Sequence, residues 1–338
     1  MHGVRLWGTP CKSPVEVLRT LGAMQAQEFL VAKWSIAQRT KGATNRSIAK
    51  LFDDGAILRT HVLRPTWHFV LPADIRWMLE LTGPRVKARM APYDRNLELT
   101  EGLYEKTNAV IAKAVKGGHR TRKELGDALE QAKIPARGQR LAHIVSRAEL
   151  ESIVCSGAMR GKQQTYASVA ERAPKAKKLS REEALEELTL RYISTRGPAT
   201  VNDFTWWSGL LTADARAGIE ALGSRVAREV VDGRTYWYVP GRTPAKPRSK
   251  KVELVQVYDE FAMSYRESRD LLFTHDVRAF SSGSNLLHPI LLDGGLIGHW
   301  KPVPGEQLLE TIPYQKINAE EKRALGKAVD RYRAFIEP

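Results

Sequence analysis

One arrangement of helices and strands repeats loosely along this chain, and it restricts the fold more than any other feature. Two helical stretches are followed by a strand, a turn and a second strand, and this order occurs three times between residues 13 and 240. Helix, turn, helix and hairpin in this order make a winged helix. We therefore expect an α+β, mainly helical protein built from tandem winged-helix units.

The clearest copy of the repeat begins at residue 120. Thr121 stands three places before Glu124, which is the spacing of a capping box at the start of a helix. Apolar residues recur along one face of a second helix, predicted over about residues 139–153. The hairpin that follows has its turn near Gly161 and Lys162.

The other two copies are less regular. After residue 178 a capped helix, two shorter helices and a hairpin turning at Asp232-Gly233 follow one another. Nearer the amino terminus, residues 13–27 and 44–55 are predicted helices, and residues 57–70 are predicted paired strands around Pro65.

A further mixed segment starts at Val252, contains a hairpin at Gly294-Gly295 and ends in a helix over about residues 319–336. The expected division is a first winged-helix unit at 1–115, a second at 116–178, a third with a basic linker at 179–251, and a closing α+β segment at 252–338.

The charge of the chain indicates a polyanionic partner. The 338 residues include 53 Lys and Arg against 38 Asp and Glu, a net charge of +15. Residues 133–178 hold ten basic and three acidic residues, a net charge of +7. This segment includes the clearest candidate for a recognition helix and the hairpin that follows it. Double-stranded DNA suits this arrangement, because a helix fits the major groove, roughly 12 Å wide. An anionic membrane and a merely solvated surface are the alternatives.

Several classes of protein are disfavoured. Cys11 and Cys155 are too few for a disulfide scaffold or a cysteine-rich zinc site. The histidines are scattered along the chain, so no metal site is expected. The sequence lacks a phosphate-binding loop motif, so no nucleotide cofactor is expected. No apolar leader and no run of 18 apolar residues is present, so a cytoplasmic, nucleoid-associated monomer without membrane contact is expected.

Gln25 and Gln27 are two residues apart, and by themselves they favour an ordinary solvated helix surface, where glutamine is common. Residues two apart on a helix face different sides, so an unbroken helix would place both side chains separately on a solvated surface. If the helix ends or bends here, the two amides can converge on one point.

At these residues the chain resembles the AlkZ/YcaQ-type winged-helix DNA glycosylases, some of which unhook DNA interstrand crosslinks. The likeness covers most of the chain and is carried by these segments: MQAQEF, LRPTWHFVLPADI, CSGAMRGKQQTYASV, VYDEFAMSYRESRD and LLDGGLIGHWK. It implies three winged helices around a basic DNA channel, with Gln25 and Gln27 matching the catalytic glutamine pair. The Gln-x-Gln form resembles the branch that gives self-resistance to crosslinking agents.

This implied chemistry needs no strong acid. A purine alkylated at N7 is cationic and leaves its deoxyribose as a neutral base, so the remaining task is to place water and stabilise the sugar cation. We expect Gln25 and Gln27 to do both. The main alternative is a non-catalytic winged-helix regulator, and a protein-interaction scaffold is a third reading.

The expected DNA contacts are basic side chains of each unit. They are Arg59, Arg64 and His68 in the first unit, Arg160 and Lys162 on the hairpin of the second, and Arg248, Lys250 and Lys251 in the basic arm. Trp67, Trp206 and Trp207 are predicted to lie in the core.

Overall fold

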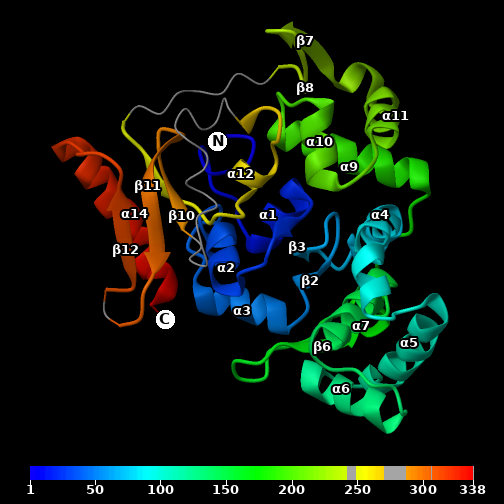
Figure 1. Cartoon of the computed structure of the whole chain (residues 1–338). Helices are drawn as coiled ribbons and strands as arrows, with labels where there is room; N and C mark the ends of the chain where they lie inside the picture. Colours follow the sequence, from blue (N-terminus) through cyan, green and yellow to red (C-terminus); the bar gives the residue numbers. More distant parts are fainter. Residues whose placement is uncertain (242–248, 270–286, 306, 338) are drawn as a thin grey trace.

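The computed structural model describes residues 1–241, 249–269, 287–305 and 307–337, and Arg248 of the basic arm lies outside this part of the chain. Helices and short antiparallel sheets alternate along the sequence, and helices predominate (Figure 1). The chain is therefore an α+β protein, as predicted. None of the described helices is both long and apolar enough to cross a membrane.

The first group of elements carries the glutamine pair. Its helices are α1 (Pro14–Leu21), α2 (Phe29–Ala37) and α3 (Asn45–Asp53), and its sheet has the order β1 (Met24–Gln25), β3 (Trp67–Val70), β2 (Leu58–His61). The prediction of a helix over residues 13–27 was wrong in its second half. Gly22 adopts φ +83° and ends α1, after which the chain enters a strand.

The second group agrees closely with the prediction. Its elements are β4 (Arg120–Thr121), α6 (Arg122–Gln131), α7 (Gly138–Leu150), β5 (Val154–Ser156), β6 (Thr165–Ser168) and α8 (Val169–Arg172). The capping box of Thr121 and Glu124 is present, and Arg160 pairs with Gln163 across the predicted turn. Two preceding helices, α4 (Ile75–Asn96) and α5 (Glu101–Val115), were not predicted. Pro84 and Pro92 lie inside α4, and because proline usually interrupts a helix, the sequence did not indicate one continuous helix here.

The third group and the closing segment also follow the predicted order. The third group contains α9 (Arg181–Arg196), α10 (Val201–Ser208), α11 (Thr212–Leu222), the 3₁₀ turn η1 (Gly223–Arg225) and the hairpin of β7 (Ala227–Val231) and β8 (Arg234–Tyr238). The closing segment contains α12 (Glu260–Met263), α14 (Ala319–Ile336) and a sheet of β9 (Val252–Leu254), β10 (His288–Leu292), β11 (Gly295–Pro302) and β12 (Leu309–Pro313). Its hairpin turns at Asp293-Gly294, one residue earlier than predicted.

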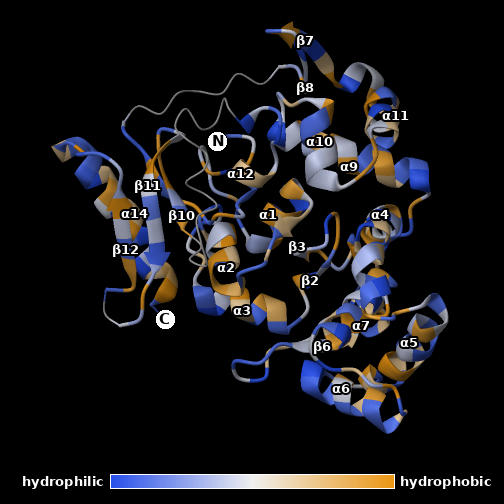
Figure 2. Ribbon diagram, in the orientation of Figure 1, coloured by the Kyte–Doolittle hydropathy of each residue, from blue (hydrophilic) through white to orange (hydrophobic). Residues whose placement is uncertain are grey.

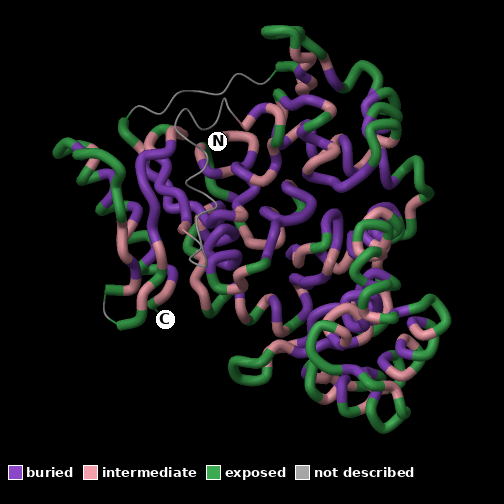
Figure 3. Tube along the Cα trace, in the orientation of Figure 1, coloured by how far each residue is buried: buried purple, intermediate pink, exposed green. Residues whose placement is uncertain are grey.

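The hydrophobic cores join these groups instead of keeping them separate. One cluster combines the first group with the closing segment, where Trp34 of α2 packs edge-on against Tyr332 of α14. A second cluster combines α4 with the third group, and α5 contributes Tyr104 and Ile111 to the core of α6 and α7. Most buried residues accordingly lie where the groups pack against one another (Figure 3). The loop between β5 and β6, in contrast, is hydrophilic and exposed (Figures 2 and 3).

Candidate active site

Gln25 ends strand β1, and Gln27 follows two residues later at a bend before α2. Gln25 pairs with His68 of β3, and the Ala26 amide donates to the Trp67 carbonyl at 2.7 Å. Gln25 is only 2% exposed, whereas Gln27 is exposed. The segment therefore presents one enclosed and one open amide.

Both main-chain polar groups of Gln25 bind side chains from the closing segment. The Gln25 amide nitrogen donates to Glu260 Oε1 at 3.0 Å, and the Gln25 carbonyl accepts from Gln256 Nε2 at 3.1 Å. These partners lie more than 200 residues away in the sequence. The position of Gln25 is consequently set by tertiary contacts and not by its neighbours in the chain.

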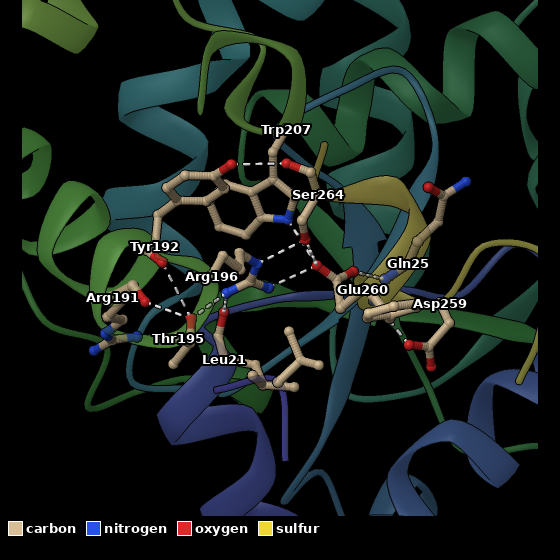
Figure 4. A network of polar contacts seen from close by, with 12 residues as sticks. Leu21, Gln25, Arg191, Tyr192, Thr195, Arg196, Trp207, Asp259, Glu260 and Ser264 are labelled. Atoms are coloured by element: carbon tan, nitrogen blue, oxygen red, sulfur yellow. Dashed lines mark hydrogen bonds and ion pairs between the residues drawn. The ribbon is translucent and has the colours of Figure 1, made fainter. Parts of the chain in front are cut away.

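Glu260 connects this strand to the third group (Figure 4). Its carboxylate accepts from Arg196 at 2.6 Å and from the indole of Trp207 at 2.7 Å, and both Glu260 and the Arg196 side chain are fully buried. Burial by itself would raise the pKa of Glu260, but the charge and hydrogen bond of Arg196 and the charge of Arg64 lower it below the ordinary value. Glu260 is thus a buried anion.

The neighbouring acid holds the closing segment to the first group. Asp259 accepts two hydrogen bonds from Arg39, at 2.9 and 2.7 Å, and neither side chain is exposed. Asp259 also caps α12 by accepting from the Phe261 amide. Two consecutive carboxylates therefore fix α12 between the first and third groups, where Glu260 accepts from the Gln25 main-chain amide.

Arg64 binds the side chain of Gln25. Its Nη2 donates to Gln25 Oε1 at 2.8 Å, and its Nη1 donates to the carbonyl of Trp207 at 3.1 Å. Burial lowers the pKa of Arg64 to about 10. The loop that carries Arg64 reaches α10 because Gly209 has no side chain, since a Cβ there would lie 2.1 Å from the Leu63 carbonyl oxygen.

Arg59 holds the segment on the other side of Gln25. Its Nε donates to the Ala26 carbonyl at 2.9 Å, and its Nη2 donates to the Gln27 carbonyl at 3.4 Å. Its Nη1 binds Gln164 Oε1, next to the loop between β5 and β6. The guanidinium also lies 4.2 Å from the ring centroid of Trp67. Arg59 therefore joins the glutamine segment to the hairpin of the second group.

Burial argues against the predicted role of three residues as direct DNA contacts. Arg59 is 4% exposed, Arg64 6% and His68 0%. Burial and the nearby charge of Arg64 hold the pKa of His68 well below its usual value, so this imidazole is neutral. In this conformation the three side chains are parts of the site's framework, because their polar groups face protein and not solvent.

The other predicted contacts lie at the surface. Lys162 is exposed at the turn between β5 and β6, and the exposed Arg160 beside it pairs with Glu124 at 2.7 Å. Lys250 pairs with Asp293 at 3.1 Å, and Lys251 pairs with Glu253 at 3.1 Å. Acidic side chains of the protein itself therefore neutralise part of this basic surface.

Two of the three tryptophans differ from the prediction of core positions. Trp207 is fully buried, as predicted, whereas Trp67 and Trp206 are half-buried. The described residues contain no cluster of His, Cys, Asp and Glu that would hold a metal ion. The important residues that sequence reasoning missed are Glu260 and Arg196, because a buried ion pair between distant segments leaves no periodic signal in either segment.

Comparison with known proteins identifies the family. The family model for DNA glycosylase AlkZ-like proteins matches residues 18–335. An interstrand DNA cross-link repair glycosylase from Streptomyces sahachiroi is 22% identical over 339 residues, which cover 96% of this chain and 90% of that protein.

The solved structure of Streptomyces sahachiroi DNA glycosylase AlkZ has the same fold, with a TM-score of 0.82 at 19% identity over 99% of this chain and 94% of the other. The family match favours the enzymatic interpretation over a non-catalytic regulator or scaffold. The chain belongs to the AlkZ-like DNA glycosylase family and is a DNA glycosylase, an enzyme that hydrolyses N-glycosyl bonds.

Proposed function

We propose that this glycosylase removes N7-alkylated purines from double-stranded DNA and unhooks interstrand crosslinks made through such purines. Gln25 and Gln27 are the proposed catalytic residues. The observation that carries the proposal is the Gln25 amide, which is 2% exposed and bonded to Arg64, two residues before the exposed Gln27. The similarity to a relative named as a cross-link repair glycosylase supports the choice of lesion.

The chemistry fits uncharged catalytic side chains. As the bond between C1′ and N9 breaks, its electron pair moves into the cationic N7-alkylpurine, which leaves as a neutral base. Water adds to C1′ and loses one proton to solvent, and the product is an abasic deoxyribose. A rigid amide contributes here by holding water or base in place, because no reorganisation is needed during the reaction. The contacts of Gln25 supply this rigidity.

The second hairpin supplies the proposed DNA grip. We propose that the three helix-and-hairpin groups are winged helices and that Arg160 and Lys162 contact phosphates from the exposed turn between β5 and β6. Gln164, in the same hairpin, binds Arg59, which in turn binds the Gln27 carbonyl. Binding of DNA phosphates by Arg160 and Lys162 at this turn would therefore bring the bound DNA strand close to Gln27.

The remaining parts of the proposal concern organisation. Lys250 and Lys251 are proposed as weaker phosphate contacts, because breaking their ion pairs offsets part of the gain. The units at 1–115, 116–178, 179–251 and 252–338 are proposed to act as one monomer. Within it α5, at the end of the first unit, shares the core of α6 and α7.

A duplex carrying one 7-methylguanine tests the reaction. Alkali cleaves the strand at each abasic site, so a denaturing gel follows base release. We expect Gln25→Ala and Gln27→Ala each to lower the single-turnover rate at least about 100-fold, which is the usual effect of losing one aligned polar group. Gln131→Ala, at an exposed end of α6, is the matched control. An unchanged rate in the double variant would reject the assignment of this pair.

A crosslinked duplex tests the choice of lesion. Wild-type protein should convert a duplex joined between two guanine N7 atoms by a nitrogen mustard into separate strands on the same gel. The Gln25→Ala variant should leave it joined. Release of 7-methylguanine without any unhooking would confine the activity to monoadducts.

A further inference from the structure

The direction of the Gln25 amide is fixed by its partner. A guanidinium has donors and no acceptor, so only the amide oxygen of Gln25 can face Arg64. The amide nitrogen Nε2 must then point away from Arg64. It is not one of the buried unpaired side-chain atoms, and it donates to no acceptor among the described residues. In Figure 4 the side chain of Gln25 extends away from the carboxylate of Glu260. Gln25 is only 2% exposed, and its N–H groups are bound by no acceptor among the described residues.

The charge behind Gln25 strengthens this donor. Arg64 and Arg196 are cations and Glu260 is an anion, and Glu260 is already paired with Arg196 at 2.6 Å. One positive charge is left over, and Arg64 directs it at Gln25 Oε1. A cation bonded to an amide oxygen polarises the amide and makes its N–H a better donor in a site of low dielectric constant. This polarised N–H would destabilise a sugar cation but would stabilise a group that gains electrons.

The leaving purine is the group that gains electrons in this reaction. As the C1′–N9 pair moves into the ring, electron density also rises at N3, whose lone pair is an acceptor in the minor groove. Gln27 differs from Gln25, because it is exposed and no described residue bonds its side-chain amide. The side-chain carbonyl of Gln27, unlike its main-chain carbonyl, is therefore free to accept a hydrogen bond from water.

We propose that the two glutamines have opposite roles and that Arg64 is the positioning residue that separates them. Gln25 donates from Nε2 to N3 of the departing purine, and Gln27 accepts from the attacking water. No proton transfer to the purine is required, because the N7-alkylated base leaves neutral. This inference rests on the proposed function, in which both glutamines take part in base removal.

Glutamate substitutions separate donor from acceptor. Gln25→Glu keeps an oxygen for Arg64 and removes the N–H, so the single-turnover rate on a 7-methylguanine duplex at pH 7 should fall about 10²–10³-fold. Gln27→Glu keeps an acceptor, and its loss should be at least tenfold smaller. Gln131→Glu adds the same negative charge at an exposed position on α6 and serves as the control for charge. A Gln25→Glu rate within tenfold of wild type would overturn the proposal.

The pH dependence of these two variants should differ. In Gln25→Glu, the Arg64 cation pairs with the introduced carboxylate and keeps it ionised, so no donor is recovered and this variant should stay slow from pH 8 to 5. In Gln27→Glu, ionisation of the introduced carboxyl group would strengthen the acceptor, so this variant should become faster as the pH rises. Rates are divided by spontaneous depurination at each pH. A normalised Gln25→Glu rate close to that of wild type at any pH in this range would show that Gln25 acts as an acceptor.

A substrate analogue tests the acceptor atom on the base. In 7-methyl-3-deazaguanine a C–H group replaces N3, so the Gln25 donor has no partner. Gln25→Ala should lower the normalised rate strongly on 7-methylguanine and less than threefold on the analogue, while Gln27→Ala should affect both. Equal losses for Gln25→Ala on both substrates would overturn the assignment to N3. If instead both alanine variants match wild type on 7-methylguanine, the proposed function itself fails.

Discussion

Arg64 donates from Nη2 to Gln25 Oε1 at 2.8 Å, and both side chains are almost completely buried. The other terminal nitrogen of Arg64 binds the carbonyl of Trp207, so the orientation of Gln25 depends on the third group as well as on its own strand. A residue that the sequence placed at the DNA surface is therefore part of the site's framework.

Removing this guanidinium should impair the chemical step and spare DNA binding. Arg64→Met frees the Gln25 amide to rotate, and we expect a 10- to 100-fold lower single-turnover rate, about the cost of a small misplacement of a catalytic group. The duplex Kd should change less than threefold. Arg64→Lys, which keeps a cation, should lose less. Because both residues act through one amide, adding Arg64→Met to Gln25→Ala should cause little further loss, and fully additive losses would contradict the coupling.

The buried anion behind Gln25 should be important for stability. Glu260→Gln leaves the Arg196 cation without its counter-charge, and breaking a buried pair in this way costs about 3–5 kcal/mol of unfolding free energy. Urea unfolding followed by circular dichroism measures the change. Glu310→Gln is the matched control, because its pair with Lys301 is well exposed and should contribute less than about 0.5 kcal/mol. Similar small effects for both variants would contradict burial of the Glu260 pair.

His288 should make the protein less stable in mild acid. Burial, together with the charge of His299, lowers the pKa of His288 from 6.5 to about 4. Between these values the unfolded chain binds a proton that the folded protein excludes, so this contribution to stability is present above pH 6.5 and is lost as the pH falls towards 4. Between pH 7.5 and 4.5, wild type should lose about 2 kcal/mol more unfolding free energy than His288→Gln. Parallel pH profiles for the two proteins would exclude this role.

Salt dependence should identify the phosphate contacts. Each phosphate neutralised contributes about 0.9 to the slope of log K against log salt concentration on duplex DNA. Lys162→Ala should lower the slope by about that amount. Lys322→Ala, at an exposed position on α14, changes the net charge equally and should leave the slope unaltered. Fluorescence anisotropy between 50 and 200 mM salt measures both, and equal slopes for all three proteins would remove Lys162 from the DNA contacts.

The sequence predicted most elements correctly where their signals are local. Thr121 and Glu124 form the capping box that their spacing indicated, Asp232-Gly233 turns the third hairpin, and the closing helix spans Ala319–Ile336. The errors arose where a local signal was misleading. Pro84 and Pro92 are tolerated inside α4, and the helical pattern before Gln25 ends at Gly22.

The sequence by itself determined the α+β class and the order of the helices and hairpins, because caps, turns and side-chain periodicity act between near neighbours. Gln25 and Gln27 became candidates through the resemblance of their segment to a known family. Only the tertiary structure decided which way the Gln25 amide faces and which basic residues are buried. Those outcomes depend on Arg64, Arg196 and Glu260 meeting from separate segments. A buried charge is stable only beside its partner, and that partner is chosen by the packing of the whole chain.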